Sequence, residues 1–588
     1  MAEKRITTEK LLFIIAFVVA LAVRLFRLGV APLSDFEASW ALQALDIARG
    51  SASTIGPNPG YIFPSGLLFF IFDGNELLAR LLPALAGAGL IWVPYLFRQP
   101  LGRSAGVIMA FGLALDPGLV VLSRIVGSPM IAMGFGLLAI GFWHTKRHYL
   151  SGFFGAMALL GGPTFWLGLL GLLLTLIIAS LLKNLGILDS LGDELGFELT
   201  KTHLINWMLT FIGTIIVVGT FFLIYPQGLG AVVDSLPVFL QGWFTPSGIP
   251  ASRLVAALVF YQPLALTFGS IAVVRGWLYR KNLSRWLSIW LIVALIISLG
   301  HQDRYVWDVA WTLIPLWALA GIELSRYLRL PKADRWPMLG EAILIFVLGV
   351  IIWLNLTSAA NVVGNDQIAR LRWVVILGAF VLGVITTILV ALGWSSKAAS
   401  HGLVLGICIS LGVYVSANMW SASQVNSTGE NELWSPAPYT RRIEALVTTL
   451  VDLSGKSTGS ENTIEIVAVS EAPSLQWALR DWRETRYSTE IFGDLPPVLL
   501  KSGDQSPPSQ TVAYRGQGFG LWVYPSWNGA LPLDWPRWLV FREAPHYTDE
   551  LILWARGDLF PDGSMLVESD ADISVPDDEE EFLEGSQE

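Results

Sequence analysis

The chain has 588 residues, of which 53% are hydrophobic and 14% are charged, and its formal net charge is −9. An average soluble domain has about 25% charged residues, so this composition excludes an ordinary soluble enzyme and indicates a polytopic membrane protein. The one cysteine, Cys408, lies in an apolar run, which excludes a disulfide framework and a cysteine zinc site. The acidic charge balance gives no reason to expect a nucleic-acid partner.

Thirteen apolar stretches are long enough, or nearly long enough, to cross a bilayer as helices. The first follows a short basic leader, and we interpret it as a retained membrane helix, with a cleaved signal peptide as the alternative. The stretches are residues 11–30, 78–97, 104–122, 129–145, 150–163, 165–183, 204–225, 254–274, 284–300, 306–323, 338–357, 371–392 and 402–420.

Basic residues gather in alternate connections between these stretches, for example in "HTKRHY" and "RGWLYRKNLSR". The positive-inside rule places these connections and the N-terminus in the cytoplasm of a multi-pass plasma-membrane protein. Residues 31–77 then form the first extracytoplasmic loop. Its apolar segment "YIFPSGLLFFIF" is too short to span and suits the membrane interface.

The chain becomes polar after the transmembrane domain, residues 1–420. We predict a linker at 421–440, an extracytoplasmic soluble domain at 441–568 and an acidic, disordered tail at 569–588. The domain is predicted to be α/β or α+β. Four segments read as strands, "TIEIVAVS", "PPVLLKS", "GLWVYPS" and "RWLVFRE", and one reads as a helix, "PSLQWALRDWRETRYS".

Two carboxylates stand close together in the first loop, in "APLSDFEASWA". Ser34 and Glu37 have the spacing of a capping box, which predicts a helix that begins here and ends at Gly50. Asp35 would favour the positive end of that helix. Both carboxylates are also candidates for chemistry, because ionisable groups against a membrane are costly.

Further ionisable residues are predicted on the same outer face. Arginine recognises phosphate through its fork of donors, and a nearby carboxylate can take a proton from an attacking hydroxyl. Transfer of a sugar from a lipid phosphate needs both groups. The candidates are Arg24 late in the first span, Tyr61 in the first loop, Arg124 at the end of the third span, and His301, Asp303, Arg304 and Tyr305 before the tenth span.

Four segments resemble a known family of membrane enzymes. They are the first-loop acidic motif, "GNELLARLLPALAG", "DPGLVVLSRIVGSPM" and "DRYVWDVAWTLIPLWALAGIEL". In order and spacing they resemble GT-C fold glycosyltransferases, especially the protein O-mannosyltransferase and aminoarabinose transferase-like branch (glycosyltransferase family 39-like).

The resemblance implies inverting transfer of a sugar from a polyprenyl-phosphate carrier to a protein or lipid acceptor on the extracytoplasmic face. It implies Asp35 as the base, with Glu37 assisting, and Arg124 and Arg304 as phosphate ligands. His301 and Tyr305 would be secondary. A divalent cation shared by Asp35 and Glu37 is left open.

Two other kinds of function compete with the enzyme. One is a noncatalytic scaffold on the same fold, favoured because Pro129 stands where many relatives carry an acid. The other is a transporter or flippase-associated protein of lipid-linked sugars, for which mid-membrane charges and internal repeats would be expected. The predicted charges instead gather at one face, which favours the enzyme.

Overall fold

The computed structural model describes residues 7–189, 200–328, 334–361, 366–423, 431–434, 438–488, 495–503, 508–509 and 511–560. Its contacts divide the chain into two compact units. The first unit comprises residues 1–440 and 523–547, and the second comprises residues 441–522 and 548–588. The predicted tail at 569–588 lies outside the described residues.

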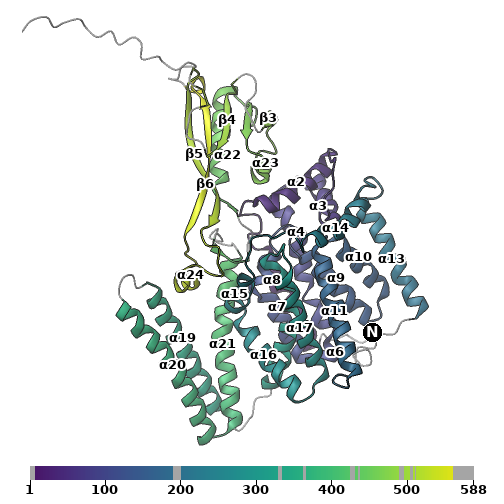
Figure 1. Ribbon diagram of the computed structural model, residues 1–588, viewed down its shortest axis with the longest axis vertical. Helices are drawn as coiled ribbons and strands as arrows, with labels where there is room; N and C mark the ends of the chain where they lie inside the picture. Colours follow the sequence, from purple (N-terminus) through teal and green to yellow (C-terminus); the bar gives the residue numbers. More distant parts are fainter. Residues whose placement is uncertain are drawn as a thin grey trace, which may run out of the picture. The chain divides into compact units, whose positions relative to one another are not determined.

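The first unit is helical (Figure 1). Its N-terminal half contains two short helices in the first loop and several paired helices around them. The elements are α1 (Thr8–Leu25), α2 (Asp35–Arg49), α3 (Pro59–Phe72), α4 (Glu76–Gly89), α5 (Trp92–Leu96), α6 (Arg98–Leu101), α7 (Arg103–Leu115), α8 (Pro117–Leu122), α9 (Met130–His144), α10 (His148–Leu160) and α11 (Thr164–Asn184).

The second half of the helical unit ends in three long helices, α19 to α21, that pack against one another. The elements are α13 (Lys201–Gly219), α14 (Gly228–Gln241), α15 (Ala251–Tyr261), α16 (Pro263–Leu278), α17 (Asn282–Gly300), the 3-10 turns η1 (Val306–Val309) and η2 (Ser325–Leu328), α18 (Ala310–Leu324), α19 (Arg335–Asn361), α20 (Asp366–Gly393), α21 (Ser396–Ala422), the short strand β1 (Tyr439–Thr440) and α24 (Trp535–Phe541).

Each of the thirteen apolar stretches coincides with one helix or with consecutive short helices. Eight helices in the described part of the chain are long and apolar enough to cross a membrane, or nine if one bent pair counts as a span. The predicted count of thirteen spans is therefore not confirmed. Several predicted spans are helices of only 13 to 15 residues, such as α7, α9 and α10.

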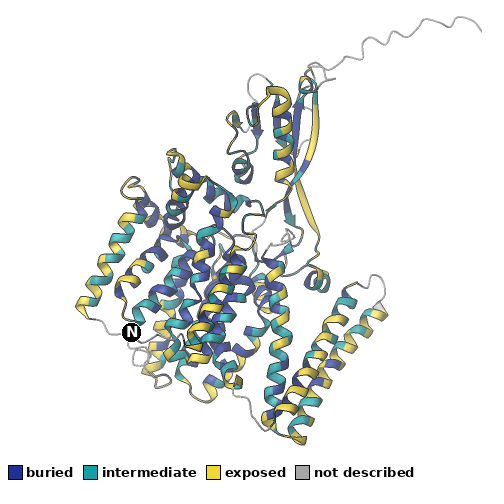
Figure 2. Cartoon of the chain, turned by 180° about the vertical axis from the view of Figure 1, so that it is seen from behind, coloured by how far each residue is buried: buried dark blue, intermediate teal, exposed yellow. Residues whose placement is uncertain are grey.

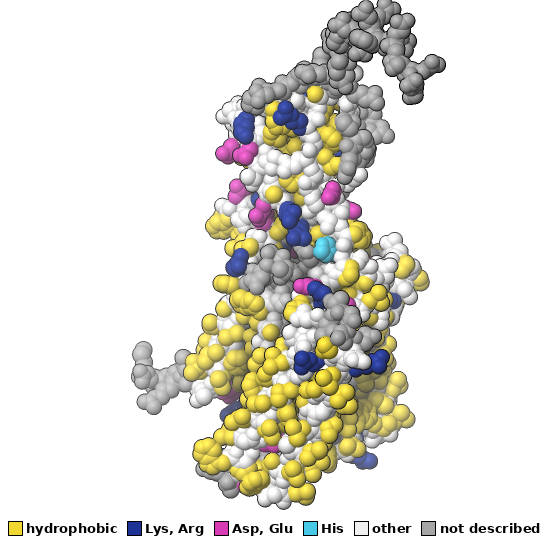
Figure 3. Space-filling view, turned by 90° about the vertical axis from the view of Figure 1, so that its left-hand side faces the viewer, with side chains coloured by type: hydrophobic (Ala, Val, Ile, Leu, Met, Phe, Trp, Pro, Cys, Tyr) yellow, Lys and Arg dark blue, Asp and Glu magenta, His cyan; other side chains and the backbone are white. Residues whose placement is uncertain are grey.

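Burial separates two kinds of long helix (Figure 2). The span Val306–Leu328 is 94% buried, because helices α7, α16 and α17 surround it. The spans in α19 and α20 are only 11% buried. The exposed side chains of the helical unit are largely apolar on the face drawn in Figure 3, as expected for side chains that contact lipid.

The predicted span at 254–274 is wrong as a single helix. The chain bends by 95° between α15 and α16. Pro263 causes the break, because it has no backbone N–H and disfavours helical geometry at the preceding Gln262. Gln262 is buried at the bend, where its side-chain amide donates to Asp116 Oδ1 at 2.9 Å.

The second unit is a mixed sheet with helices. Its strands are neighbours in the order β5-β6-β4-β2-β3, where β2 is parallel to β3 and β4, and β4 is antiparallel to β6. Val498 faces both Ile466 of β2 and Ala555 of β6. The elements are α22 (Ile443–Thr458), β2 (Ile466–Val469), α23 (Pro473–Ala478), β3 (Thr485–Tyr487), β4 (Val498–Ser502), β5 (Tyr514–Pro525), β6 (His546–Arg556) and η4 (Gly557–Leu559).

Two predictions for the C-terminal region are wrong. The segment "RWLVFRE" is not a strand, because residues 535–541 form α24, whose buried Trp538 packs against the rings of Phe260 and Tyr261 in the helical unit. The helix predicted for "PSLQWALRDWRETRYS" ends at Ala478, because Thr485–Tyr487 pairs with β2 instead. Tertiary contacts have outweighed the local pattern in both cases.

Candidate functional site

The first loop begins with the predicted capping box. The Ser34 hydroxyl accepts from Glu37 N at 3.4 Å, and Glu37 Oε2 accepts from Ser34 N at 3.1 Å. Helix α2 ends at Gly50, which has the left-handed φ of +70° typical of a C-cap. The capping interpretation of this motif is confirmed.

Glu37 is held by an arginine that sequence reasoning missed. Arg80 of α4 forms a bidentate ion pair with it, through two bonds of 2.8 Å to Oε1 and Oε2. Both side chains are almost fully buried. Arg80 also donates to the carbonyls of Ala31 and Pro32, so it links the start of the first loop to α4. The sequence could have indicated a role for Arg80, because it is a single arginine in an apolar helix.

This pair changes the roles expected for the two first-loop carboxylates. Both oxygens of Glu37 are occupied by Arg80, which does not suit a shared cation site with Asp35. No group of three or more metal-ligating side chains is present among the described residues. Asp35 differs from Glu37, because it is half-buried in the first turn of α2 rather than enclosed.

The predicted phosphate ligand Arg124 donates to protein carbonyls. Its guanidinium donates to Val23, Arg24, Phe26 and Arg27, with distances of 2.9 to 3.3 Å. These carbonyls lie at the end of α1, where four carbonyls have no helical partner. Arg124 therefore caps α1 through its two terminal guanidinium nitrogens.

Arg24 and Tyr61 are also placed inside the fold. Arg24 is fully buried and donates to Ser123 Oγ at 3.0 Å and to the carbonyls of Leu113 and Ala114 at the end of α7. The Tyr61 hydroxyl donates to Ala79 O at 3.0 Å. Both residues join helices to one another, and neither is exposed.

A buried aspartate supports this arrangement. Asp116 caps α8 by accepting from Leu119 N at 2.9 Å, and it also accepts from Gln262 and from the Trp317 indole at 2.6 Å. It lies fully buried between helices that are distant in sequence. Sequence reasoning used it only as part of a motif.

The turn between α17 and η1 carries four predicted residues. Arg304 Nε donates to His301 O at 2.7 Å, and its Nη1 donates to Ile249 O at 3.3 Å. Asp303 N donates to Gly242 O at 2.7 Å. The turn is thereby fastened to the segment that follows α14.

His301 lies in an aromatic cage at this turn. Its ring stacks on Phe239 with a centroid distance of 5.6 Å and meets Trp243 edge-on at 5.3 Å. Burial lowers the pKa of the imidazole below its ordinary value. Neither ring nitrogen has a hydrogen-bond partner among the described residues.

An aromatic layer connects this turn to the first loop. The rings of Tyr305 and Trp307 stack at 4.4 Å, and the ring of Phe36, next to Asp35, lies 5.1 Å from that of Trp307. Gly127 leaves room for the Phe36 ring, because a Cβ there would come within 2.9 Å of it, and the φ of Gly127 is +75°. The structure thus brings Phe36, the neighbour of Asp35 in sequence, into contact with the rings of Tyr305 and Trp307.

A cavity of about 340 Å³ borders this layer, within the first unit. Its wall combines aromatic faces with polar groups, and the indole N–H groups of Trp434 and Trp527 have no hydrogen-bond partner among the described residues. Aromatic faces with unsatisfied donors suit a sugar ring. The lining residues are Ser247, Gly248, Ile249, Arg253, Tyr305, Val306, Trp307, Asn431, Glu432, Leu433, Trp434, Tyr439, Pro525 and Trp527.

Part of this wall comes from the predicted linker. Residues 432–434 are buried rather than solvated, because Glu432 pairs with Arg542 at 3.2 Å and accepts from Tyr261 and from Ser421. Arg542 lies over the rings of Tyr261 and Trp538. The polar composition of this segment predicts a solvated linker. Burial could not be predicted from it, because the ion-pair partner of Glu432 is Arg542, 110 positions later in the sequence.

Comparisons with known proteins place the chain beside two membrane proteins. No protein-family profile matches it, and no curated protein matches its sequence. A crystal structure of ArnT from Cupriavidus metallidurans bound to undecaprenyl phosphate is 15% identical, with a TM-score of 0.48 over 81% of this chain and 85% of that one. The apo form of the same protein gives 15% identity and a TM-score of 0.45 over 80% and 84% of the two chains.

The archaeal oligosaccharyltransferase AglB from Archaeoglobus fulgidus, in complex with an inhibitory peptide and a dolichol-phosphate, is 13% identical. Its TM-score is 0.39, and the match covers 81% of this chain and 64% of that one. The chain is similar to ArnT and AglB at these levels of identity and structural overlap.

Proposed function

We propose that the chain is a membrane glycosyltransferase that moves a sugar from a polyprenyl-phosphate carrier to an acceptor hydroxyl. The observation that carries the proposal is the 340 Å³ cavity, whose aromatic wall contacts the turn that holds Asp35 through Phe36 and Trp307. The cavity offers a sugar ring both apolar faces and hydrogen-bond donors. The cavity is lined by Tyr305, one of the predicted site residues, and by Trp307, whose ring contacts Phe36 next to Asp35.

The carrier is proposed to be a polyprenyl phosphate. Undecaprenyl phosphate and dolichol-phosphate are the lipids held in the similar ArnT and AglB structures. Two guanidinium groups accompany the cavity here: Arg253 lines it, and Arg304 donates to Ile249 of its wall. Their charge would stabilise the phosphate as it leaves.

Asp35 is the proposed base. Its carboxylate would take the proton of the acceptor hydroxyl while the acceptor oxygen bonds to the anomeric carbon. The bond from that carbon to the phosphate oxygen breaks, its electron pair leaves with the carrier phosphate, and attack from the opposite side inverts the configuration. Glu37 would act indirectly, because its pairing with Arg80 holds α2 in place.

The test compares two aspartates of α2. Membranes with wild type, Asp35→Asn or Asp46→Asn would receive radiolabelled polyprenyl-phosphate sugars and native acceptors. Asp46 is exposed on the same helix and serves as the matched control. We expect Asp35→Asn to lose about 10²-fold or more of the transfer rate and Asp46→Asn to retain it.

Two results would contradict the proposal. Transfer that survives Asp35→Asn at the wild-type rate would remove Asp35 as the base. Absence of transfer by wild type with every donor tried would favour the scaffold or transporter instead.

A further inference from the structure

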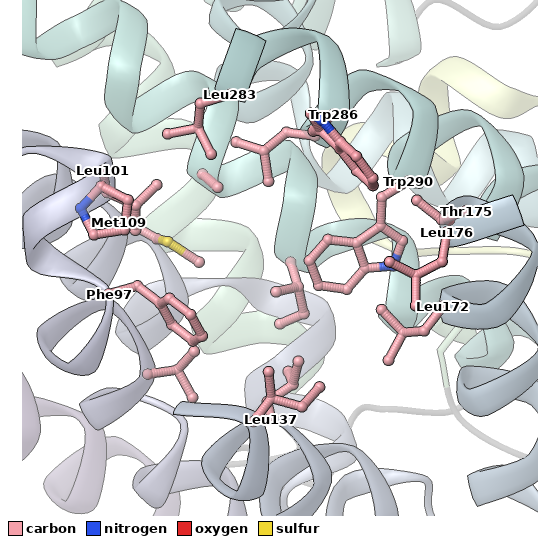
Figure 4. A pocket seen from close by; sticks show the side chains of 16 residues that line it. Phe97, Leu101, Met109, Leu137, Leu172, Thr175, Leu176, Leu283, Trp286 and Trp290 are labelled. Atoms are coloured by element: carbon pink, nitrogen blue, oxygen red, sulfur yellow. The ribbon is translucent and has the colours of Figure 1, made fainter. Parts of the chain in front are cut away.

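A second cavity, of about 350 Å³, lies in the helical unit and has a different character (Figure 4). Its wall comes from α5, α6, α7, α9, α11, α17 and α18, and in Figure 4 the side chains of Phe97, Met109, Leu137 and Trp290 surround a common space. On α17 the lining residues Leu283, Trp286, Leu287 and Trp290 follow helical spacing, so one face of this helix is turned toward the cavity.

The cavity offers a ligand almost no polar groups. Fifteen of its sixteen lining residues are apolar, and the exception, Thr175, already donates its hydroxyl to Gly171 O at 2.7 Å. A sugar or phosphate would lose its hydration here without compensation. Three of the contributing segments, α11, α17 and the span ending in η2, are long and apolar enough to cross a membrane. The occupant that fits is a hydrocarbon chain.

Charge beside the cavity indicates which kind of lipid supplies that chain. Phe97, Pro100 and Leu101 line the cavity around α6, and Arg98 and Arg103 flank these residues in sequence. Both arginines approach one carboxylate, Glu9, at 3.7 Å, so the cluster retains an excess positive charge. The Arg103 side chain is 83% exposed and available to an anion.

We propose that this cavity binds one acyl chain of an anionic phospholipid, whose phosphate contacts Arg98 and Arg103. A phospholipid is chosen over a polyprenyl phosphate for one reason. The proposed reaction takes place at the first loop, whereas α6 lies at the opposite end of the helical unit (Figure 1). This choice of lipid rests on the proposed function, but the existence of a chain-binding site does not.

The test uses the full chain in nanodiscs that contain phosphatidylglycerol with a photoactivatable group in one acyl chain. Crosslinked peptides would be mapped by mass spectrometry. We expect labelling of Met109 and Leu137, and at least a five-fold loss of it in Leu172→Trp, which fills the cavity. Leu173→Trp is the matched control, because Leu173 is 48% exposed on the outside of the same helix and does not line the cavity.

The headgroup is tested separately. Arg103→Gln should reduce phosphatidylglycerol labelling several-fold, to the level of a phosphatidylethanolamine probe. Ala318→Leu, a smaller filling change, repeats the cavity test should Leu172→Trp fail to fold.

Three outcomes would overturn the inference. They are unchanged labelling in the filled variants, equal labelling by the two phospholipids, or stronger labelling by a photoactivatable polyprenyl phosphate. None of these readouts requires sugar transfer, so failure of the proposed function would be seen separately.

Discussion

Glu37 and Asp35 differ in what surrounds them, although they are two positions apart. Glu37 is enclosed by Arg80, by both polar groups of Ser34 and by Val126 N, which donates to it at 3.3 Å. Such a carboxylate is fixed in position and desolvated together with its cation. Asp35 is half-buried in the first turn of α2.

The first prediction concerns the Glu37–Arg80 pair. Glu37→Gln leaves the buried Arg80 guanidinium without its counter-charge, and we expect a loss of about 3–5 kcal/mol in the free energy of unfolding. Thermal unfolding in detergent would measure it. A double change, Glu37→Gln with Arg80→Leu, should recover part of the loss. If Glu37→Gln unfolds like wild type and abolishes transfer, then Glu37 acts in the chemistry.

The second prediction concerns His301. Its folded-state pKa lies below the unfolded value, because burial in the cage opposes the charged imidazolium. The unfolded chain therefore binds the proton first, and His301 lowers stability as pH falls below the unfolded pKa of about 6.5. Above that pH His301 has no effect on the free energy of unfolding, because it is neutral in both states.

The measurement is the melting temperature between pH 7.5 and 5.5. Wild type should lose stability over this window, and His301→Phe, which preserves stacking on Phe239, should lose less. The groups that face this histidine are Asp303 and Arg304 of its own turn. Equal slopes for wild type and His301→Phe would refute the assignment, and His546→Phe, at an exposed position, is the control.

At the scale of elements, arginines end helices in this fold. Arg124 meets the carbonyls that end α1, and Arg24 meets those that end α7. Both helices end before the apolar sequence does. The predicted first span at 11–30, for example, ends as a helix at Leu25. The cation complements the negative end of each helix dipole.

The third prediction separates the capping role of Arg124 from a phosphate-binding role. Arg124→Lys retains a positive charge but cannot donate to four carbonyls from one planar group. We expect a loss of about 1–3 kcal/mol in the free energy of unfolding. The KM for the lipid-linked donor should stay within about two-fold of wild type, because the guanidinium already faces protein. A large rise in KM with unchanged stability would restore the phosphate role.

At the scale of the whole molecule, the sidedness of the membrane is a prediction from charge alone. It places the connection at Lys146 in the cytoplasm and the second unit outside the cell. The chain has one cysteine, so a Cys408→Ser background allows single cysteines to be introduced.

The fourth prediction tests this orientation with an impermeant thiol reagent. Ser460→Cys, on an exposed part of the second unit, should react in intact cells. Lys146→Cys, exposed between α9 and α10, should react only after lysis. The reverse pattern would invert the topology and move the first loop, with Asp35, to the cytoplasmic side.

Sequence patterns predicted the helical elements well, because lipid selects continuous apolar runs. Each of the thirteen stretches coincides with one or more helices, and the capping box at Ser34 and the C-cap at Gly50 are local motifs that a few consecutive residues specify. The strands at 466–469 and 498–502 also lie within segments that were predicted as strands from their apolar residues. The segment at 535–541 was misread, because an apolar run of seven residues suits a strand or a buried helix equally.

The candidate site was predicted only in part. The sequence identified the first loop and the turn at 301–305, but it could not separate a catalytic carboxylate from a structural one. The partners that make this distinction are distant: Arg80 is 43 positions from Glu37, and Trp307 is 271 positions from Phe36. The cavity wall at Trp434 and Trp527 had no local signal at all.

The sequence by itself determined that this is a helical membrane protein with a C-terminal unit of different composition, and that ionisable residues accumulate in a few segments between the apolar stretches. The length of an apolar stretch depends only on consecutive residues. The bilayer requires such stretches to form helices, because their backbone groups must bond internally. Only the tertiary structure decided which charges are paired. Arg80 neutralises Glu37, Arg542 neutralises Glu432, and Arg124 caps α1. Because burying a charge is costly unless a partner is near, these long-range contacts indicate a structural role for Glu37, and Asp35 stays the proposed base to test.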